Sequence, residues 1–137
     1  MIPMHRDVAA IEVSNSVIAE MHELAPSLVF ATVITGDGFE IGRSVRDRDG
    51  ADRLAGMSSS LQALSDAVAR ELAIGTAKYV VIEAENARLL QLRVPGQPTI
   101  LVALFDHHEL LGKALAISRQ GVDRLASLLS ERQRTIQ

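Results

Sequence analysis

The sequence lacks cysteine and tryptophan, and aromatic residues make up only 3% of its 137 residues. Without cysteine there can be no disulfide, no thiol nucleophile and no thiolate metal site, and the composition fits a reducing compartment. Tyr79 is the only tyrosine, which disfavours nucleic-acid binding by stacking of bases on aromatic side chains. A hydrophobic core therefore has to be built from aliphatic side chains.

The sequence also has no strong excess of charge and no long apolar run. Its net charge is -3 and no basic patch stands out, so we expect no nucleic-acid partner. The start, "MIPMHRDVAAIEV", lacks the basic-then-apolar order of a signal peptide, and the run 100–105 is too short to enter a membrane. With 47% hydrophobic residues, we expect one globular cytoplasmic domain over 1–137, with a core of about 7–130.

No enzyme motif survives inspection. Gly36-Asp37-Gly38 is followed by strand-like alternation instead of the Lys and Ser/Thr of a phosphate-binding loop, so it predicts a β-hairpin. Ser58, Ser59 and Ser60 fall within a helical pattern and have no nucleophile motif around them. We therefore predict no catalytic and no cofactor-binding residues.

The segment "DHHELLGK" is the one plausible metal site, because Asp106, His107, His108 and Glu109 all carry ligand atoms. Adjacent histidines point in different directions, however, and no further imidazole stands at a defined spacing. The alternative is a helix start with Asp106 as the N-cap and Glu109 three residues later, which is capping-box spacing. We favour the helix start and predict no metal.

Hydrophobic periodicity predicts an α/β (α+β) chain with one mostly antiparallel, five-stranded sheet. The middle helix has an apolar stripe that includes Met57, Leu64 and Val68, with small residues beside it. The expected helices are 7–25, 51–74 and 109–130, and the expected strands are 28–35, 39–45, 79–85, 88–94 and 99–105.

The strand sequences indicate where each strand lies in the sheet. Segments 28–34 and 100–105 are apolar on both faces, as central strands are, whereas 39–45 is polar on one face, as an edge strand can be. The strand that begins "YVVIEAE" at Tyr79 follows a crossover helix, which favours an edge position, yet it is almost entirely apolar. Because an uncovered edge of this kind would aggregate, we expect something to pair with it.

Three stretches in this order resemble the Roadblock family, which includes the dynein light chain roadblock and bacterial regulators of Ras-like GTPases. They are "FATVITGDGFEIGRS", like the family's first hairpin, "YVVIEAENARLLQLRV", like its third and fourth strands, and "ILVALFDHHELLGKALAISRQGVDRLASLL", like its last strand and helix. The family often has Asn-Leu-Gly where this chain has Leu110-Leu111-Gly112. The resemblance covers roughly 13–129.

The resemblance implies a profilin-like fold with strand order 2-1-5-4-3, the first and last helices on one face and the middle helix on the other. It also implies a homodimer through the middle helix and third strand. This agrees with the apolar edge, and with small residues at helical spacing that would let two helices approach closely. The residues expected at this interface are Ala55, Ser58, Ser59, Gln62, Ala63, Tyr79, Val80, Val81, Ile82 and Glu83.

The family's usual role implies a non-enzymatic scaffold or regulator that binds a small Ras-like GTPase. The face formed by the paired middle helices is the expected docking surface, with Arg53, Gln62 and Arg70 as its exposed positions. The alternative is a small-ligand sensor on a profilin-like or PAS-like sheet. That function needs a pocket with convergent polar groups, and the strands offer few inward polar residues.

Overall fold

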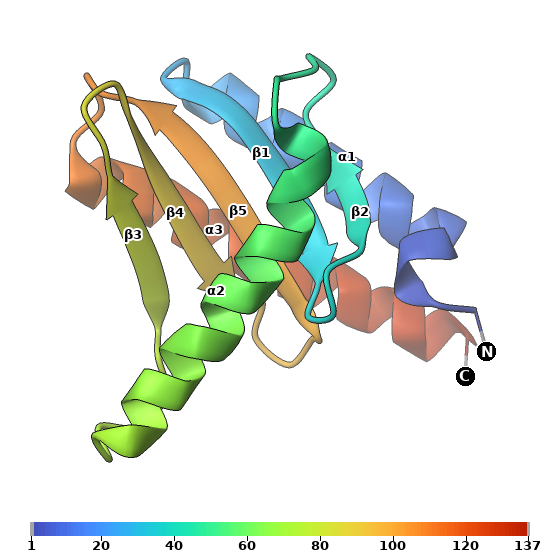
Figure 1. The fold of residues 1–137 in the computed structure, drawn as a ribbon. Helices are drawn as coiled ribbons and strands as arrows, with labels where there is room; N and C mark the ends of the chain where they lie inside the picture. Colours follow the sequence, from blue (N-terminus) through green and yellow to red (C-terminus); the bar gives the residue numbers. More distant parts are fainter. Residues whose placement is uncertain (1, 137) are drawn as a thin grey trace.

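A computed structural model of the chain describes residues 2–136 (Figure 1). The helices and strands follow the predicted order, preceded by a short 3-10 helix. They are η1 (Met4–Arg6), α1 (Val8–Leu24), β1 (Leu28–Thr35), β2 (Glu40–Arg43), α2 (Ala51–Glu71), β3 (Tyr79–Glu83), β4 (Ala87–Arg93), β5 (Thr99–Asp106) and α3 (Leu111–Ile136).

The strands form one sheet in the order β2-β1-β5-β4-β3, and every neighbouring pair is antiparallel. The predicted strand order and sheet type are therefore confirmed. β1 and β5 are central and almost fully buried, as their two apolar faces predicted. β2 and β3 lie at the two edges.

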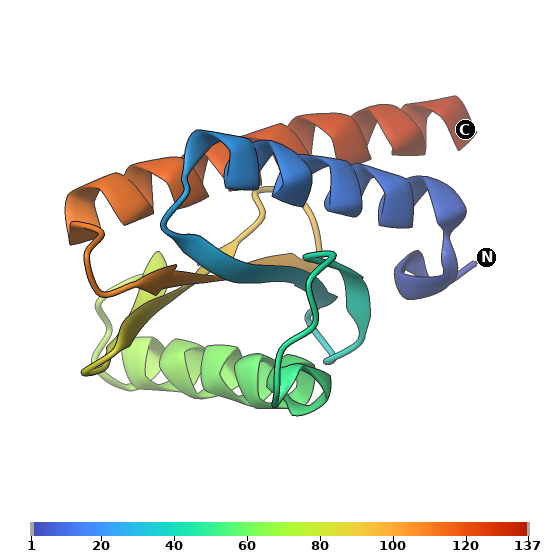
Figure 2. The same ribbon diagram turned by 90° about the horizontal axis from the view of Figure 1, so that it is seen from above.

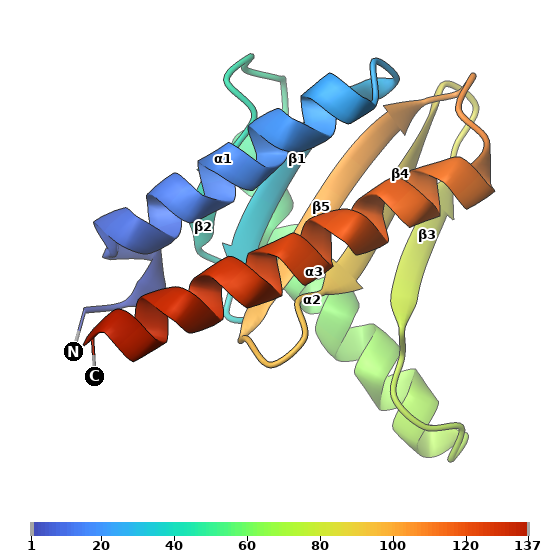
Figure 3. The same ribbon diagram turned by 180° about the vertical axis from the view of Figure 1, so that it is seen from behind.

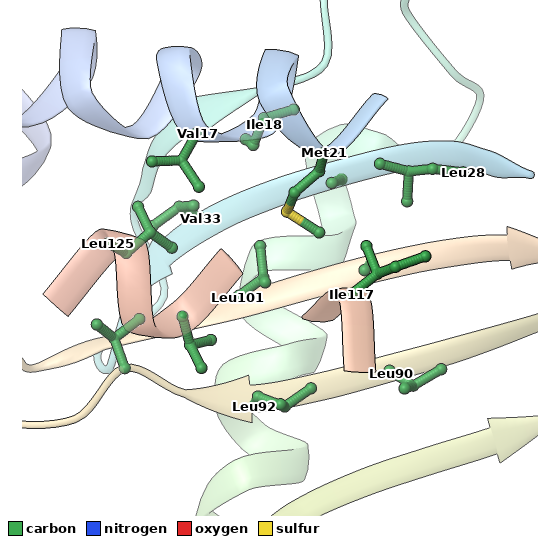
Figure 4. Close-up of a cluster of buried hydrophobic side chains, with 14 of the residues drawn as sticks. Val17, Ile18, Met21, Leu28, Val33, Leu90, Leu92, Leu101, Ile117 and Leu125 are labelled. Carbon is green, nitrogen blue, oxygen red and sulfur yellow. The ribbon is translucent and has the colours of Figure 1, made fainter. Parts of the chain in front are cut away.

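The helices form a layer on each face of the sheet, as expected. α1 and α3 lie side by side on one face, and α2 crosses the other face alone (Figures 2 and 3). The main hydrophobic core lies under the α1–α3 layer, where Ile18 and Met21 of α1 and Leu125 of α3 meet Val33 and Leu101 of the sheet (Figure 4). This core is almost entirely aliphatic, as the composition predicted.

One glycine allows α3 to approach this core closely. A Cβ atom at Gly121 would lie 2.8 Å from the Met21 sulfur and 3.3 Å from a Leu101 methyl carbon. A larger residue here would therefore force the Met21 thioether to move aside.

The hairpin prediction for Gly36-Asp37-Gly38 is confirmed. The Thr35 amide donates to the Phe39 carbonyl at 2.7 Å, and Gly38 has a φ of 95°, which glycine adopts without steric cost. The Thr35 hydroxyl donates to the Asp37 carboxylate at 2.5 Å and accepts from the Phe39 amide at 3.0 Å. Asp37 therefore stabilises the turn.

The prediction that Asp106 caps the last helix is wrong. Asp106 is the last residue of β5, its carboxylate accepts from the His108 amide, and α3 begins only at Leu111. Glu109 is buried and accepts a hydrogen bond of 2.7 Å from the Ser27 hydroxyl. The capping-box prediction failed because Asp106 binds the His108 amide within the connection, while Glu109 binds Ser27, far away in the chain.

Candidate protein-binding surface

Helix α2 rests on the sheet through small and polar side chains. The residues of α2 that are buried are Ala51, Ala55, Ser58, Gln62 and Ala69. Under them, the buried Gln91 of β4 donates from Nε2 to the Ser58 carbonyl at 2.9 Å and to Gln62 Oε1 at 3.1 Å. Little apolar area is buried by such residues, so this contact contributes less to stability than the α1–α3 core does.

Leu54 packs against the sheet, but four other large apolar side chains of α2 and its C-terminal end do not. Met57, Leu64, Val68 and Leu72 recur at helical spacing and are all at least half exposed, with Leu64 at 62%. At 100° per residue this stripe lies roughly 120° round the helix from the sheet-facing side. The helix therefore presents an apolar flank that no described residue covers.

Between this flank and the sheet lies a hollow of about 230 Å³. Its walls are Leu54 and Met57 of α2 and apolar residues of three strands, among them Leu89 and Leu104. Arg48 and Asp49 are its charged lining residues. Because the apolar flank helps to line this hollow, the flank lies on the side of α2 where the sheet is left uncovered.

Strand β3 forms a second exposed apolar region, at the edge of the sheet. It pairs with β4 along Tyr79 to Glu83, and no other described strand pairs with its outer edge. Ile82, 46% exposed, lies on the α2 face of the sheet, whereas Tyr79, 40% exposed, lies on the α3 face, where Arg119 approaches its ring. A row of free backbone groups beside apolar side chains is a template for pairing with another chain.

Ion pairs flank the apolar surface. Arg93 of β4 binds Asp66 of α2, and this guanidinium holds the pKa of the Asp66 carboxyl below its usual value. At the other end of β3, Arg88 binds Glu83 and likewise lowers the pKa of that carboxyl. The charged groups of both ion pairs therefore lie at the border of the apolar surface.

Part of the predicted dimer interface is occupied within the chain itself. Ala55, Ser58 and Gln62 are buried against the sheet of their own chain, which leaves little of these side chains for a second helix. Ser59 donates its hydroxyl to the Gly36 carbonyl at 2.6 Å and lies beside Gly38. The small residues of α2 thus bring it close to its own hairpin and sheet.

The other predicted positions lie where a partner could reach them. Arg53 and Arg70 are exposed, whereas Gln62 is buried and is not the exposed position that we expected. Ala63 is exposed on the side of α2 away from both the sheet and the apolar stripe. Glu83 is exposed at the end of β3.

The histidine and carboxylate side chains of residues 2–136 do not form a metal-binding cluster, since no three of them converge as metal ligands. The rings of His107 and His108 lie with their centroids 4.0 Å apart and are tilted by 40° to one another. None of the helices described has the length and apolar character needed to cross a membrane.

Comparison with known protein families identifies the chain. The model of the Roadblock/LC7 domain matches residues 24–105, more than half of the sequence. The chain belongs to the Roadblock/LC7 family. The resemblance seen in the three sequence stretches is thereby confirmed. A comparison with curated protein sequences finds no significant match, so membership rests on the family model and the fold.

Solved structures show the same fold at low sequence identity. Myxococcus xanthus MglB superposes with a TM-score of 0.80 at 16% identity, covering 88% of this chain and 90% of that one. The gliding protein MglB from Thermus thermophilus gives 0.78 at 22% identity, covering 91% and 93%. Acanthamoeba castellanii profilin IA gives 0.57 at 15% identity, covering 82% and 96%. The Roadblock/LC7 chain thus has a profilin-like fold.

Proposed function

We propose that this Roadblock/LC7 protein is a non-enzymatic, homodimeric scaffold or regulator of a Ras-like small GTPase in the cytoplasm. The observations that carry the proposal are the exposed apolar flank of α2 and the free, largely apolar edge strand β3. Such a surface on a protein marks an interaction site. The family role and the MglB-like fold support a GTPase as the further partner.

In the proposed dimer, two copies of β3 pair across a two-fold axis and continue the sheet from one subunit into the other. The apolar flank of each α2, with Leu64 and Val68, then packs over the part of the joined sheet that the two α2 helices leave open. This arrangement satisfies the backbone groups at the edge and removes Ile82 from water. Arg53 and Arg70 stay exposed and form part of the surface offered to the GTPase.

A pair of glutamate substitutions on α2 tests the dimer. Leu64→Glu places an uncompensated charge in the interface and should raise the dimer dissociation constant at least about a hundredfold. Ala63→Glu, its neighbour on the solvent side, is the matched control and should have a much smaller effect. Light scattering behind a sizing column measures both. A wild-type monomer at micromolar concentration, or a Leu64→Glu dimer of unchanged affinity, would refute the interface.

The proposed binding of a GTPase is tested by titration. The titrant is a Ras-like GTPase from the same organism, loaded with GDP or a GTP analogue. We expect binding to the wild-type dimer, weakened by Arg53→Glu with Arg70→Glu, and no GTP hydrolysis by the scaffold alone. Failure of every such GTPase to bind in either nucleotide state would contradict it. Saturable binding of a metabolite would instead favour the ligand-sensor alternative.

A further inference from the structure

A groove lies along the C-terminal half of α1, on the β2 side of the molecule. Two adjoining hollows of about 630 and 530 Å³ form it and share His22 and Arg46. Its apolar lining includes Ile18, Leu28 and Val29, and the fully exposed side chain of Val45 stands beside them. Residues 44–48 of the connection from β2 to α2 complete the lining.

The groove carries unpaired positive charge. Arg46 and Arg48 line it, and neither guanidinium has an ion pair or hydrogen bond with another residue in 2–136. Arg43 is already bound by carboxylates, at 2.7 Å by Glu40 and at 3.0 Å by Asp47 and Asp52. Glu40 and Asp52 raise the pKa of its guanidinium. Asp47 is the only acidic residue in the lining and belongs to that cluster.

A free strand edge runs beside these charges. β2 pairs with β1 from Thr32 to Ile34, and Ser44 adds hydrogen bonds to the Ala31 backbone, at 2.9 Å to its carbonyl and 2.8 Å from its amide. Leu28 to Phe30 have β5 on one side and no described strand on the other. The Leu28 amide already donates to the Ala25 carbonyl at 3.0 Å, so the open edge is short and centred on Val29, the extra residue of a bulge. The backbone of an extended segment can add to such an edge.

The wall opposite the free edge is held in place. His22 Nε2 lies 2.7 Å from the Ser44 hydroxyl, which is itself bonded to the Ala31 backbone. This contact fixes the last turns of α1 against the end of β2. The groove is therefore preformed, and a ligand need not order it on binding.

We propose that this groove docks an extended acidic segment of a partner protein. The strand edge receives its backbone, the apolar floor around Val29 and Val45 receives its apolar side chains, and its carboxylates face Arg46 and Arg48. A free anion or a lipid headgroup would use the arginines but neither the strand edge nor the apolar floor. The groove lies away from β3, and Arg46 does not line the hollow beside α2, whereas Arg48 lines both, so Arg46 is the arginine that tests this proposal separately from the dimer.

The test uses a synthetic eight-residue peptide of alternating valine and glutamate with blocked ends, titrated into the ¹⁵N-labelled full-length protein. We expect amide shifts at Val29, Val45 and Arg46, and weaker binding at higher salt. Arg46→Glu should raise the dissociation constant at least about tenfold. Val45→Glu, a change at a fully exposed side chain, should weaken binding as well.

Arg134→Glu, at an exposed position on α3, is the charge-matched control and should leave the affinity within about twofold. A peptide with lysine in place of glutamate should not bind. Shifts confined to α2 and β3, or no effect of Arg46→Glu, would overturn the proposal. So would groove shifts caused by protein concentration alone, which indicate a second copy, or binding of phosphatidylserine vesicles but not the peptide, which indicates a membrane.

Discussion

The two edges of the sheet differ in how far the rest of the chain covers them. Strand β2 is only four residues long, and η1 and α1 cover it. His5 of η1 stacks on Phe39 with ring centroids 4.3 Å apart. The Asn15 side chain of α1 accepts a hydrogen bond from the Arg43 amide at 3.1 Å. At β3, four apolar residues and Glu83 form an edge that no described strand covers. One edge is closed within the chain and the other is open.

This difference shows that the open edge is specific to one side of the fold. The chain has the means to protect an edge, namely a short strand, a side chain that pairs with the backbone, and a covering helix. It uses all of them at β2. Their absence at β3, beside the exposed flank of α2, is the reason to assign that side to a partner.

The largest expected effect comes from the same substitution made in the two edge strands. Ile41→Ala in β2 removes a buried core side chain and should lower the free energy of unfolding by about 3 kcal/mol. Ile82→Ala in β3 should change the unfolding of the separated subunit by less than about 1 kcal/mol and mainly weaken the dimer. Urea unfolding at several protein concentrations separates the two effects. Equal losses that do not depend on concentration would mean that both edges are structural.

A smaller effect should follow from opening the closed edge. Asn15→Ala leaves the Arg43 amide without its side-chain acceptor and should cost about 1 kcal/mol. Hydrogen exchange should become faster at Arg43, while the amides of β3 stay unchanged. Unaltered exchange at Arg43 would show that η1 alone is enough to protect this edge.

The smallest expected effect concerns the ion pair that joins α2 to β4. Because Arg93 lowers the pKa of Asp66 in the folded state, the pair stabilises the protein above the pKa that Asp66 has when unfolded, and this contribution is lost as the pH falls through the lower, folded pKa. Asp66→Asn should therefore cost less than about 1 kcal/mol at neutral pH and flatten the acid side of the stability curve. Urea unfolding between neutral and acid pH measures this. If the free energy of unfolding of Asp66→Asn fell with pH as steeply as that of the wild type, the ion pair would not contribute to stability.

Much of the fold could be predicted because its elements carry strong local patterns. The alternation after Gly38 and the two-sided apolar character of β1 and β5 reflect the period of the sheet directly. The connection before α3 could not be predicted in the same way. Asp106 and Glu109 have the spacing of a helix cap, but Ser27, 82 residues from Glu109 in the chain, binds the second carboxylate.

The face of α2 could not be predicted either, and the cause is general. The small residues Ala55 and Ser58 predict a contact between two helices. Such residues equally allow one helix to lie close to its own sheet. Buried Gln91 decides between these, because it bonds to the backbone of α2. Glutamine in a strand gives no sequence signal of that role.

The two chain ends suggest how this protein can be attached to other molecules. Asp7, at the start of α1, binds Arg132 near the end of α3, and both ends lie on the β2 side of the sheet, far from β3 (Figures 1 and 3). In a two-fold dimer built on β3, all four termini would then sit at the outer ends of the particle. A fluorescent label, a surface tether or a second fused protein joined there would leave the central platform accessible.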